Sequence, residues 1–145
     1  MGHKVTLVSC NDDQDSRKRI VEGLNGYNES VVPYIIPGQW MRLEFAAKNE
    51  SGEVIGGILA MLGHWGGLEI NVLWVSEGHR KNGLGSMLMK EVENIAREKG
   101  AVLAMVSTFD FHAPEFYLKN GYTVIGKHEN FPGNHTRYYF EKRFR

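Results

Sequence analysis

The sequence predicts a single α/β domain with a mixed, mostly antiparallel sheet flanked by helices. Its 145 residues are enough to bury one hydrophobic core. A strand, turn, helix and strand follow one another over residues 68–106, and such a unit is a right-handed crossover between parallel strands. Two alternating runs before it, Trp40–Lys48 and Val54–Leu62, predict an antiparallel hairpin. We therefore expect one domain over residues 1–145.

Composition argues against several classes of protein. Lys+Arg and Asp+Glu each count 17, so the overall charge gives no reason to expect binding to nucleic acid or to an anionic membrane. No apolar run is long enough to cross a bilayer. A single cysteine, Cys10, permits no internal disulfide, and no signal peptide is apparent, so we expect a cytoplasmic protein. Met1-Gly2 resembles the start of a myristoylation signal, but no membrane-directed basic residues follow it.

The first forty residues predict a strand, a helix and a less regular segment. Val5–Val8 has the composition of a short strand. Polar residues at 11–13 are good helix starters, and the apolar spacing after them predicts a helix from about Gln14 to Leu24. The Gly23–Gly26 stretch is expected to end this helix. Tyr27–Gln39 contains two prolines and is either a short helix followed by a loop or an apolar loop over the core.

Hydrophobic periodicity defines the remaining elements. Gly56 and Gly57, inside the second hairpin strand, indicate a bulge. An apolar stripe from Leu84 to Lys99 predicts an amphipathic helix with Gly100 as its C-terminal cap. The other expected elements are, in chain order, a strand over Leu68–Val75, a strand over Ala101–Val106, a helix from Pro114 to about Lys119, and closing strands over Tyr122–Gly126 and Thr136–Phe144.

The stretch from His79 to Ser86 joins a predicted strand to a predicted helix and indicates an anion-binding site. A helix start leaves backbone N–H groups without intrahelical partners and carries partial positive charge. Gly83 and Gly85 would let an anion approach the backbone closely. Two familiar phosphate loops do not match, because Leu88 stands where the dinucleotide fingerprint has its third glycine and no lysine follows Gly85.

Two motifs carry a resemblance to a known family. The spacing Arg-x-x-Gly-x-Gly, formed by Arg80, Gly83 and Gly85, resembles the acyl-coenzyme A pyrophosphate loop of the GNAT acetyltransferase superfamily. A second segment, Ala113–Tyr122, is similar to the superfamily's Ala-x-x-x-Tyr-x-x-x-Gly-Phe/Tyr motif, and the interval between the two fits one helix and one strand. Specific matching covers about Leu68–Tyr122, while the order of strands fits nearly the whole chain.

The resemblance implies acetyl-CoA as cofactor and a sheet whose two central parallel strands splay apart around the pantetheine arm. The backbone of residues 73–75 would face that arm, the amides of residues 81–86 would face the pyrophosphate, and Arg80 could add a charge-assisted contact. No metal is expected, because the six histidines lack ligand spacing. The cofactor-binding residues so implied are Leu73, Trp74, Val75, Arg80, Lys81, Asn82, Gly83, Leu84, Gly85, Ser86, Asp110 and Tyr117.

The resemblance also implies catalytic roles. Tyr117 would lie near the cofactor sulfur and protonate the departing thiolate; the alternative is a tyrosine that packs its ring on the core. Glu69 stands where some members carry a glutamate base acting through water, although a glutamate at a strand start is often simply solvated. Asp110 replaces a frequent asparagine, so its charge could instead hold a cationic acceptor. Ordered water could also deprotonate the amine, and the rival side chains for the base are Glu44, His64, His79 and His112.

Three functions compete on these grounds. The first is an N-acetyltransferase that moves the acetyl group from acetyl-CoA to an amine of a small molecule or protein, as a monomer or homodimer. The second is a sensor that binds acyl-CoA without turnover, and Tyr117 argues against it because a binder needs no proton donor. A DNA-binding regulator is disfavoured by the neutral charge balance. The acceptor would enter opposite the cofactor, shaped by the Tyr27–Gln39 and Asn130–His135 loops.

Overall fold

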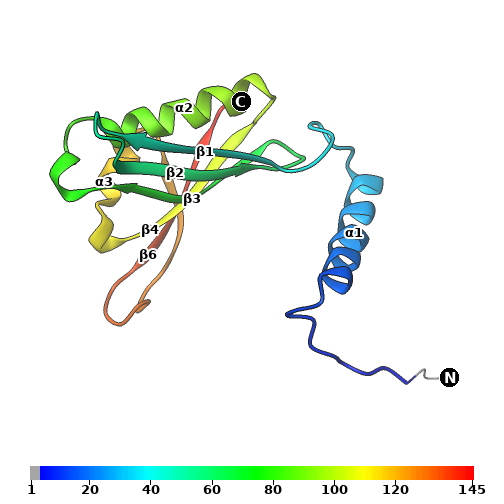
Figure 1. The fold of residues 1–145 in the computed structure, drawn as a ribbon. Helices are drawn as coiled ribbons and strands as arrows, with labels where there is room; N and C mark the ends of the chain where they lie inside the picture. Colours follow the sequence, from blue (N-terminus) through cyan, green and yellow to red (C-terminus); the bar gives the residue numbers. More distant parts are fainter. Residues whose placement is uncertain (1–3) are drawn as a thin grey trace. The chain divides into compact units, whose positions relative to one another are not determined.

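The computed structural model describes residues 4–145 and forms two compact units, one ending at Tyr34 and one running from Ile35 to Arg145 (Figure 1). The first unit holds a single helix, and the second holds the sheet and the remaining helices. The predicted signal at Met1-Gly2 lies outside the described residues.

Helix α1 (Gln14–Val31) is longer than the sequence predicts. It begins where expected, because the Asp13 carboxylate accepts a 3.1 Å hydrogen bond from the Ser16 backbone N–H. Glycine costs a helix only about 1 kcal/mol relative to alanine, so the expected end within Gly23–Gly26 is wrong. The helix ends at Val32 instead, which takes an extended conformation (φ −129°, ψ 111°) because the residue before a proline disfavours the helical region.

The predicted strand over Val5–Val8 is also wrong, since these residues adopt no regular secondary structure. Their apolar side chains are largely exposed, and Leu7 is 95% exposed. A strand exists only where a neighbour completes its hydrogen-bond ladder. The strands of the described sheet all lie between residues 41 and 143.

The second unit is a six-stranded mixed sheet in the order β1-β2-β3-β4-β6-β5. The β3–β4 pair is parallel and every other pair is antiparallel, as the sequence predicts. Its strands and helices are β1 (Met41–Lys48), β2 (Val54–Leu62), β3 (Gly67–Val75), the 3-10 turn η1 (Glu77–His79), α2 (Leu84–Glu98), β4 (Leu103–Phe109), the 3-10 turn η2 (Asp110–His112), α3 (Pro114–Lys119), β5 (Thr123–His128) and β6 (Arg137–Arg143).

Strand β4 departs from its expected bounds, and the pairing of β2 and β3 is irregular. Strand β4 begins and ends later than predicted, because the Val102 N–H bonds to the Gly66 carbonyl in a loop contact and the strand continues along β6 to Phe109. In β2, the pairing with β1 skips Ile55, directly beside the predicted Gly56-Gly57 bulge. A second irregularity, which the sequence did not indicate, skips Asn71 in β3.

Helix α2 lies along one face of the sheet and forms the core with it (Figure 1). Its apolar stripe is buried, and Met89, Val92 and Ala96 are 0% exposed. The alternate residues of the strands meet this stripe, so Ile58 and Leu68 are also 0% exposed. The opposite face of the sheet keeps partly exposed apolar side chains, among them Leu59, Val72 and Trp74. None of the helices within residues 4–145 is long and apolar enough to cross a membrane.

Candidate active site

Strands β3 and β4 separate half-way along their length. They pair only from Gly67 with Leu103 to Ile70 with Val106, although β3 continues to Val75 and β4 to Phe109. Each strand stays bonded to its outer neighbour beyond that point, β3 to β2 and β4 to β6. The backbone edge of β3 that faces β4 therefore has no ladder partner there, and its N–H and C=O groups can bind an extended ligand.

A cleft of about 960 Å³ occupies this opening. Its walls come from the separated ends of β3 and β4, the loop after β3, the first turn of α2, and α3. The lining consists of residues 70–75, 79–81, 83–86, 106–109, 111–113, 115–117 and 119. A single cavity thus joins a free strand edge, a helix N-terminus and the helix that carries Tyr117.

The N-terminus of α2 presents free backbone donors to the cleft. Gly83 caps the helix with left-handed backbone angles (φ 81°, ψ 3°), and no side chain bonds to the first N–H groups. The preceding Lys81 also has a positive φ of 67°, so consecutive peptide groups turn sharply around the helix start. Free N–H groups and the helix dipole make this turn suitable for an anion such as a pyrophosphate.

Two residues of the predicted loop have additional structural roles. The Nε of Arg80 donates a 2.9 Å hydrogen bond to the Val75 carbonyl, which ties the loop to the end of β3. At Gly85, a Cβ atom would lie 3.1 Å from the Phe116 ring, so this glycine allows α3 to pack closely against α2. A Cβ at Gly83 would meet nothing within 4 Å, and the constraint there is the positive φ.

Tyr117 lies on α3, belongs to the hydrophobic core and also lines the cleft. The residue is 7% exposed, and its ring centroid lies 5.5 Å from that of Phe140 and 6.1 Å from that of Tyr122. Within residues 4–145 its hydroxyl makes no hydrogen bond, and no fully buried polar side-chain atom there lacks a partner, so the hydroxyl is not completely buried, and Tyr117 is one of the residues that line the cleft. Burial raises the pKa of Tyr117, which keeps the phenol protonated.

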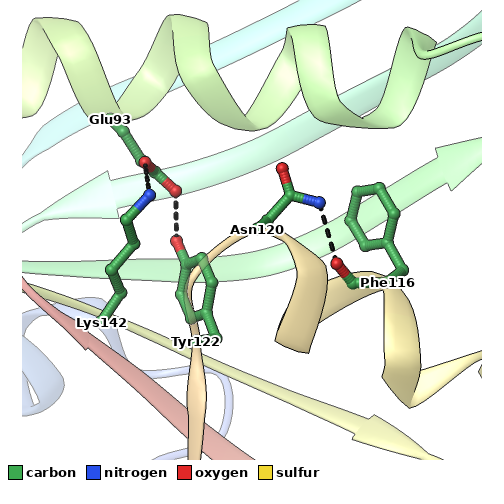
Figure 2. Close-up of polar contacts among 5 residues, drawn as sticks. All are labelled: Glu93, Phe116, Asn120, Tyr122 and Lys142. Atoms are coloured by element: carbon green, nitrogen blue, oxygen red, sulfur yellow. Dashed lines mark hydrogen bonds and ion pairs between the residues drawn. The ribbon is translucent and has the colours of Figure 1, made fainter.

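A buried polar network holds the end of α3 in place (Figure 2). The Glu93 carboxylate, on α2, accepts hydrogen bonds from the Tyr122 hydroxyl at 2.6 Å and from the Lys142 ammonium at 2.8 Å. The Asn120 side chain donates to the Phe116 carbonyl at 2.8 Å. The Tyr122 backbone N–H bonds to the Tyr117 carbonyl at 3.0 Å. These bonds connect α2, α3 and β6 and fix the position of Tyr117.

Most of the sequence-predicted cofactor residues meet in this cleft, but three predicted site residues do not line it. Asn82 lies outside the lining. Glu69 is paired with Met61 and Met105 where β3 and β4 are still bonded to each other. The Asp110 carboxylate lies 2.8 Å from the Nδ1 of His135, a contact that is an ion pair when the imidazole is protonated, and it accepts a 2.9 Å hydrogen bond from the Thr136 backbone N–H. The residues that do line the cleft are Leu73, Trp74, Val75, Arg80, Lys81, Gly83, Leu84, Gly85, Ser86 and Tyr117.

The alternative base candidates are scattered. His79 and His112 line the cleft, and the Nδ1 of His79 lies 2.8 Å from the Ser76 hydroxyl. His64 lies 3.2 Å from the Ile36 carbonyl instead. Glu44 lines a separate, shallower hollow of about 380 Å³ on β1 and β2. Within residues 4–145, no three His, Cys, Asp or Glu side chains are grouped so that they could hold a metal ion.

Sequence reasoning missed two kinds of residue at the cleft. Phe116 packs under Gly85, and its place beside Tyr117 in the motif was an available signal. Ser107, Phe109 and Phe111 line the far wall, where β4 leaves β3. Nothing local in the sequence marks them, because their position depends on which strand β4 pairs with.

A parallel strand pair that opens beside a helix N-terminus is the arrangement that the resemblance to GNAT acetyltransferases implies. The chain belongs to the family described as "Acetyltransferase (GNAT) family", whose model matches residues 18–122. The protein is therefore an acetyl-CoA-dependent acetyltransferase.

Three relatives illustrate the family match. Over 97 residues, the chain is 38% identical to blasticidin-S acetyltransferase of Streptomyces morookaense, which covers 66% of this chain and 71% of that one. A crystal structure of an acetyltransferase from Bacillus cereus superimposes with a TM-score of 0.82 at 34% identity, covering 96% of this chain and 98% of the other. A crystal structure of aminoglycoside 6'-N-acetyltransferase complexed with coenzyme A shares the fold (TM-score 0.61, 21% identity, 84% and 79% covered).

Proposed function

We propose that the protein transfers an acetyl group from acetyl-CoA to a primary amine of a small molecule or protein by direct attack. The observation that carries the proposal is that one cleft is lined both by the α2 N-terminus and by Tyr117. We further propose that residues 1–145 act as one domain, in the cytoplasm, as a monomer or homodimer. The family match supports the one-domain proposal, because it extends from residue 18 across the boundary at Tyr34.

The donor is proposed to lie along the free edge of β3. Its pyrophosphate would accept hydrogen bonds from backbone N–H groups at the start of α2, including those of residues 81–86, and its pantetheine arm would bond to the backbone of residues 73–75. Arg80 would add charge while it holds the end of β3. The acetyl group would then lie where β3 and β4 separate, close to Tyr117.

The proposed acetyl transfer has three steps. The neutral amine attacks the thioester carbonyl, the carbon–sulfur bond of the tetrahedral intermediate breaks, and the thiolate takes a proton from Tyr117 as free coenzyme A is released. The proton lost by the amine passes to water, the Tyr117 phenolate regains a proton from water, and the products are the acetamide and the thiol. Glu69 remains a proposed base, and because it does not line the cleft, it would act only through a chain of water.

The acceptor class draws support from the relatives. The relative with 38% identity is named for acetylation of blasticidin S, and one of the structural relatives is named for acetylation of an aminoglycoside. A small-molecule amine is thus the acceptor class we favour over a protein amine. The alternative function, an acyl-CoA sensor without turnover, would use the same cleft but would have no need for the accessible phenol of Tyr117.

Ser86 gives a decisive test of donor binding. It is the third residue of α2 and lines the cleft, so Ser86→Asp places a carboxylate where the pyrophosphate is proposed to bind. An acidic residue in the first turn of a helix stabilises the helix, so the variant should fold at least as stably as the wild type. We expect calorimetry to show coenzyme A binding at least about 10-fold weaker for Ser86→Asp, as like-charge repulsion at a few ångströms implies.

The control is Ser86→Asn, which matches the shape of aspartate without its charge and should bind coenzyme A close to the wild-type affinity. Equal affinities of the aspartate and asparagine variants for coenzyme A would contradict the proposed position of the donor pyrophosphate. Turnover is measured separately, by detecting the free thiol released from acetyl-CoA with a panel of amines. Coenzyme A binding without turnover on any amine would favour the sensor.

A further inference from the structure

Arg137, the first residue of β6, is held rigidly on the sheet face opposite α2. Phe140, three positions later on the same strand, is 1% exposed in the core, so the alternation of side chains along the strand places Arg137 on the other face. The guanidinium carbon lies 5.5 Å from the Phe109 ring centroid and 5.1 Å from the Tyr139 ring centroid. Its Nε and Nη2 both donate to the Ser107 hydroxyl, at 3.2 and 2.8 Å.

The charge of this arginine is unpaired in the part of the chain that the structure describes. No ion pair there includes Arg137. Asp110, which follows Phe109 in the chain, is occupied by His135 and by the Thr136 N–H. A guanidinium has five N–H donors, and only two nitrogens are directed at Ser107. A half-buried, immobilised arginine with spare donors is preorganised to bind a carboxylate.

This guanidinium lies next to the cleft. Ser107 and Phe109 line the cleft directly beyond Val106, the last residue of β4 that pairs with β3. Two more aromatic rings lie beside that of Phe109. The Phe109 ring stacks on the Phe111 ring with a centroid distance of 5.4 Å, and its centroid lies 6.1 Å from that of the Phe131 ring. Phe111 is 51% exposed, and Phe131 is 47% exposed. The surroundings of Arg137 therefore combine one free cation with exposed aromatic surface.

We propose that Arg137 binds a carboxylate of the acceptor, so that the preferred acceptor is an amine that also carries a carboxylate and an apolar or planar body. The proposal rests on the proposed function, because it needs a donor in the neighbouring cleft. The α2 N-terminus supplies the donor's anion site, and Arg137 lies outside the residues that line the cleft. The rings of Phe109 and Phe111 would hold the acceptor body while its amine points toward the strand opening.

The test uses two amines that differ by one carboxylate, 4-(aminomethyl)benzoate and benzylamine. Each is titrated by calorimetry into the full chain saturated with coenzyme A. We expect the wild type to bind the benzoate at least about 10-fold more tightly than benzylamine, and Arg137→Gln to weaken benzoate binding about 10- to 100-fold, as loss of a charged hydrogen-bonded pair implies. Benzylamine binding should change less than about twofold.

Two further variants complete the design. Arg137→Lys keeps the charge but loses the planar fork, so it should retain part of the preference for the benzoate. The matched control is Arg143→Gln, because Arg143 lies on the same strand and face but is exposed and already lies 3.5 Å from the Glu141 carboxylate. It should leave binding of both amines unchanged.

Several outcomes would overturn the carboxylate proposal. For the wild type, these are equal affinity for the two amines or no binding of either amine. For Arg137→Gln, they are equally weakened binding of both amines or weakened binding of coenzyme A. Failure of the proposed function looks different, because the wild type would then either not bind coenzyme A before any amine is added or bind it without turnover of any amine in the panel.

Discussion

The Tyr122 hydroxyl donates a 2.6 Å hydrogen bond to the carboxylate of Glu93, which is 4% exposed (Figure 2). The same carboxylate pairs with Lys142 at 2.8 Å, so its negative charge is buried but doubly compensated. The bond joins the middle of α2 to Tyr122, between the end of α3 and the start of β5. The position of Tyr117 in the cleft therefore depends on a contact that lies outside the cleft.

Removing the Tyr122 hydroxyl should destabilise the protein. Tyr122→Phe keeps the ring but leaves one oxygen of a buried carboxylate without a donor, which costs about 1–3 kcal/mol. We expect the free energy of unfolding, measured by denaturant titration, to fall by that amount. A change below about 0.5 kcal/mol would mean that water or Lys142 satisfies the carboxylate instead.

The same bond predicts a dependence of stability on alkaline pH. Burial, followed by the hydrogen bond and charge of Glu93, raises the pKa of Tyr122 above its ordinary value. A folded-state pKa above the unfolded value gives stability that is complete below about pH 10 and is lost as the pH rises beyond it. The wild type should therefore lose stability more steeply above about pH 10 than Tyr122→Phe. If the free energy of unfolding fell equally with pH in the two proteins, ionisation of Tyr122 would not be the cause of the alkaline loss of stability.

Tyr117→Phe should separate catalysis from packing. The change keeps the ring contacts with Phe140 and Tyr122 and removes only the proposed proton donor. Turnover should fall by roughly 100- to 10,000-fold, the usual contribution of positioned acid catalysis. The coenzyme A dissociation constant and the melting temperature should stay close to wild type. Unchanged turnover would show that water or another group protonates the thiolate.

Gly85→Val should act through α3 rather than by filling the anion site. A Cβ at Gly85 would lie 3.1 Å from the Phe116 ring, so valine would push α3 away from α2 and lower both the melting temperature and the affinity for coenzyme A. The control is Gly78→Ala, because a Cβ at Gly78 meets nothing within 4 Å and its φ is not positive. An unchanged melting temperature with weakened binding would instead point to direct contact with the donor.

Asp110→Asn should loosen the loop between β5 and β6. Desolvation raises the pKa of Asp110, but hydrogen bonds from Thr136 and His135 and the nearby histidine charge outweigh it, so the pKa is lowered. The stabilisation is thus present above about pH 4 and is lost as the pH falls below it. We expect faster hydrogen exchange at the Thr136 amide in the variant at neutral pH, and in the wild type at acidic pH after correction for intrinsic rates. Protection equal to wild type would show that the loop is held by other contacts.

The sequence by itself determined the elements whose signals are local. The apolar stripe of α2, the alternating hairpin strands and Pro114 at the start of α3 each depend on residues within one element, and the structure confirms them. The first family motif located the loop from Arg80 to Ser86, where Lys81 and Gly83 have positive φ angles. Local chemistry was sufficient there because helix starts and hydrophobic periodicity act over a few residues.

Only the tertiary structure decided which distant residues meet. The composition of Val5–Val8 predicts a strand, but these residues form none, because a strand depends on a partner elsewhere in the chain. The resemblance places Asp110 among the cofactor-binding residues, but its carboxylate contacts His135 and Thr136, which lie 25 and 26 positions later in the chain. Arg137 meets Ser107, 30 positions earlier, through the antiparallel pairing of β6 with β4. The physical reason is that pairing register and packing are properties of the whole sheet, which no local pattern encodes.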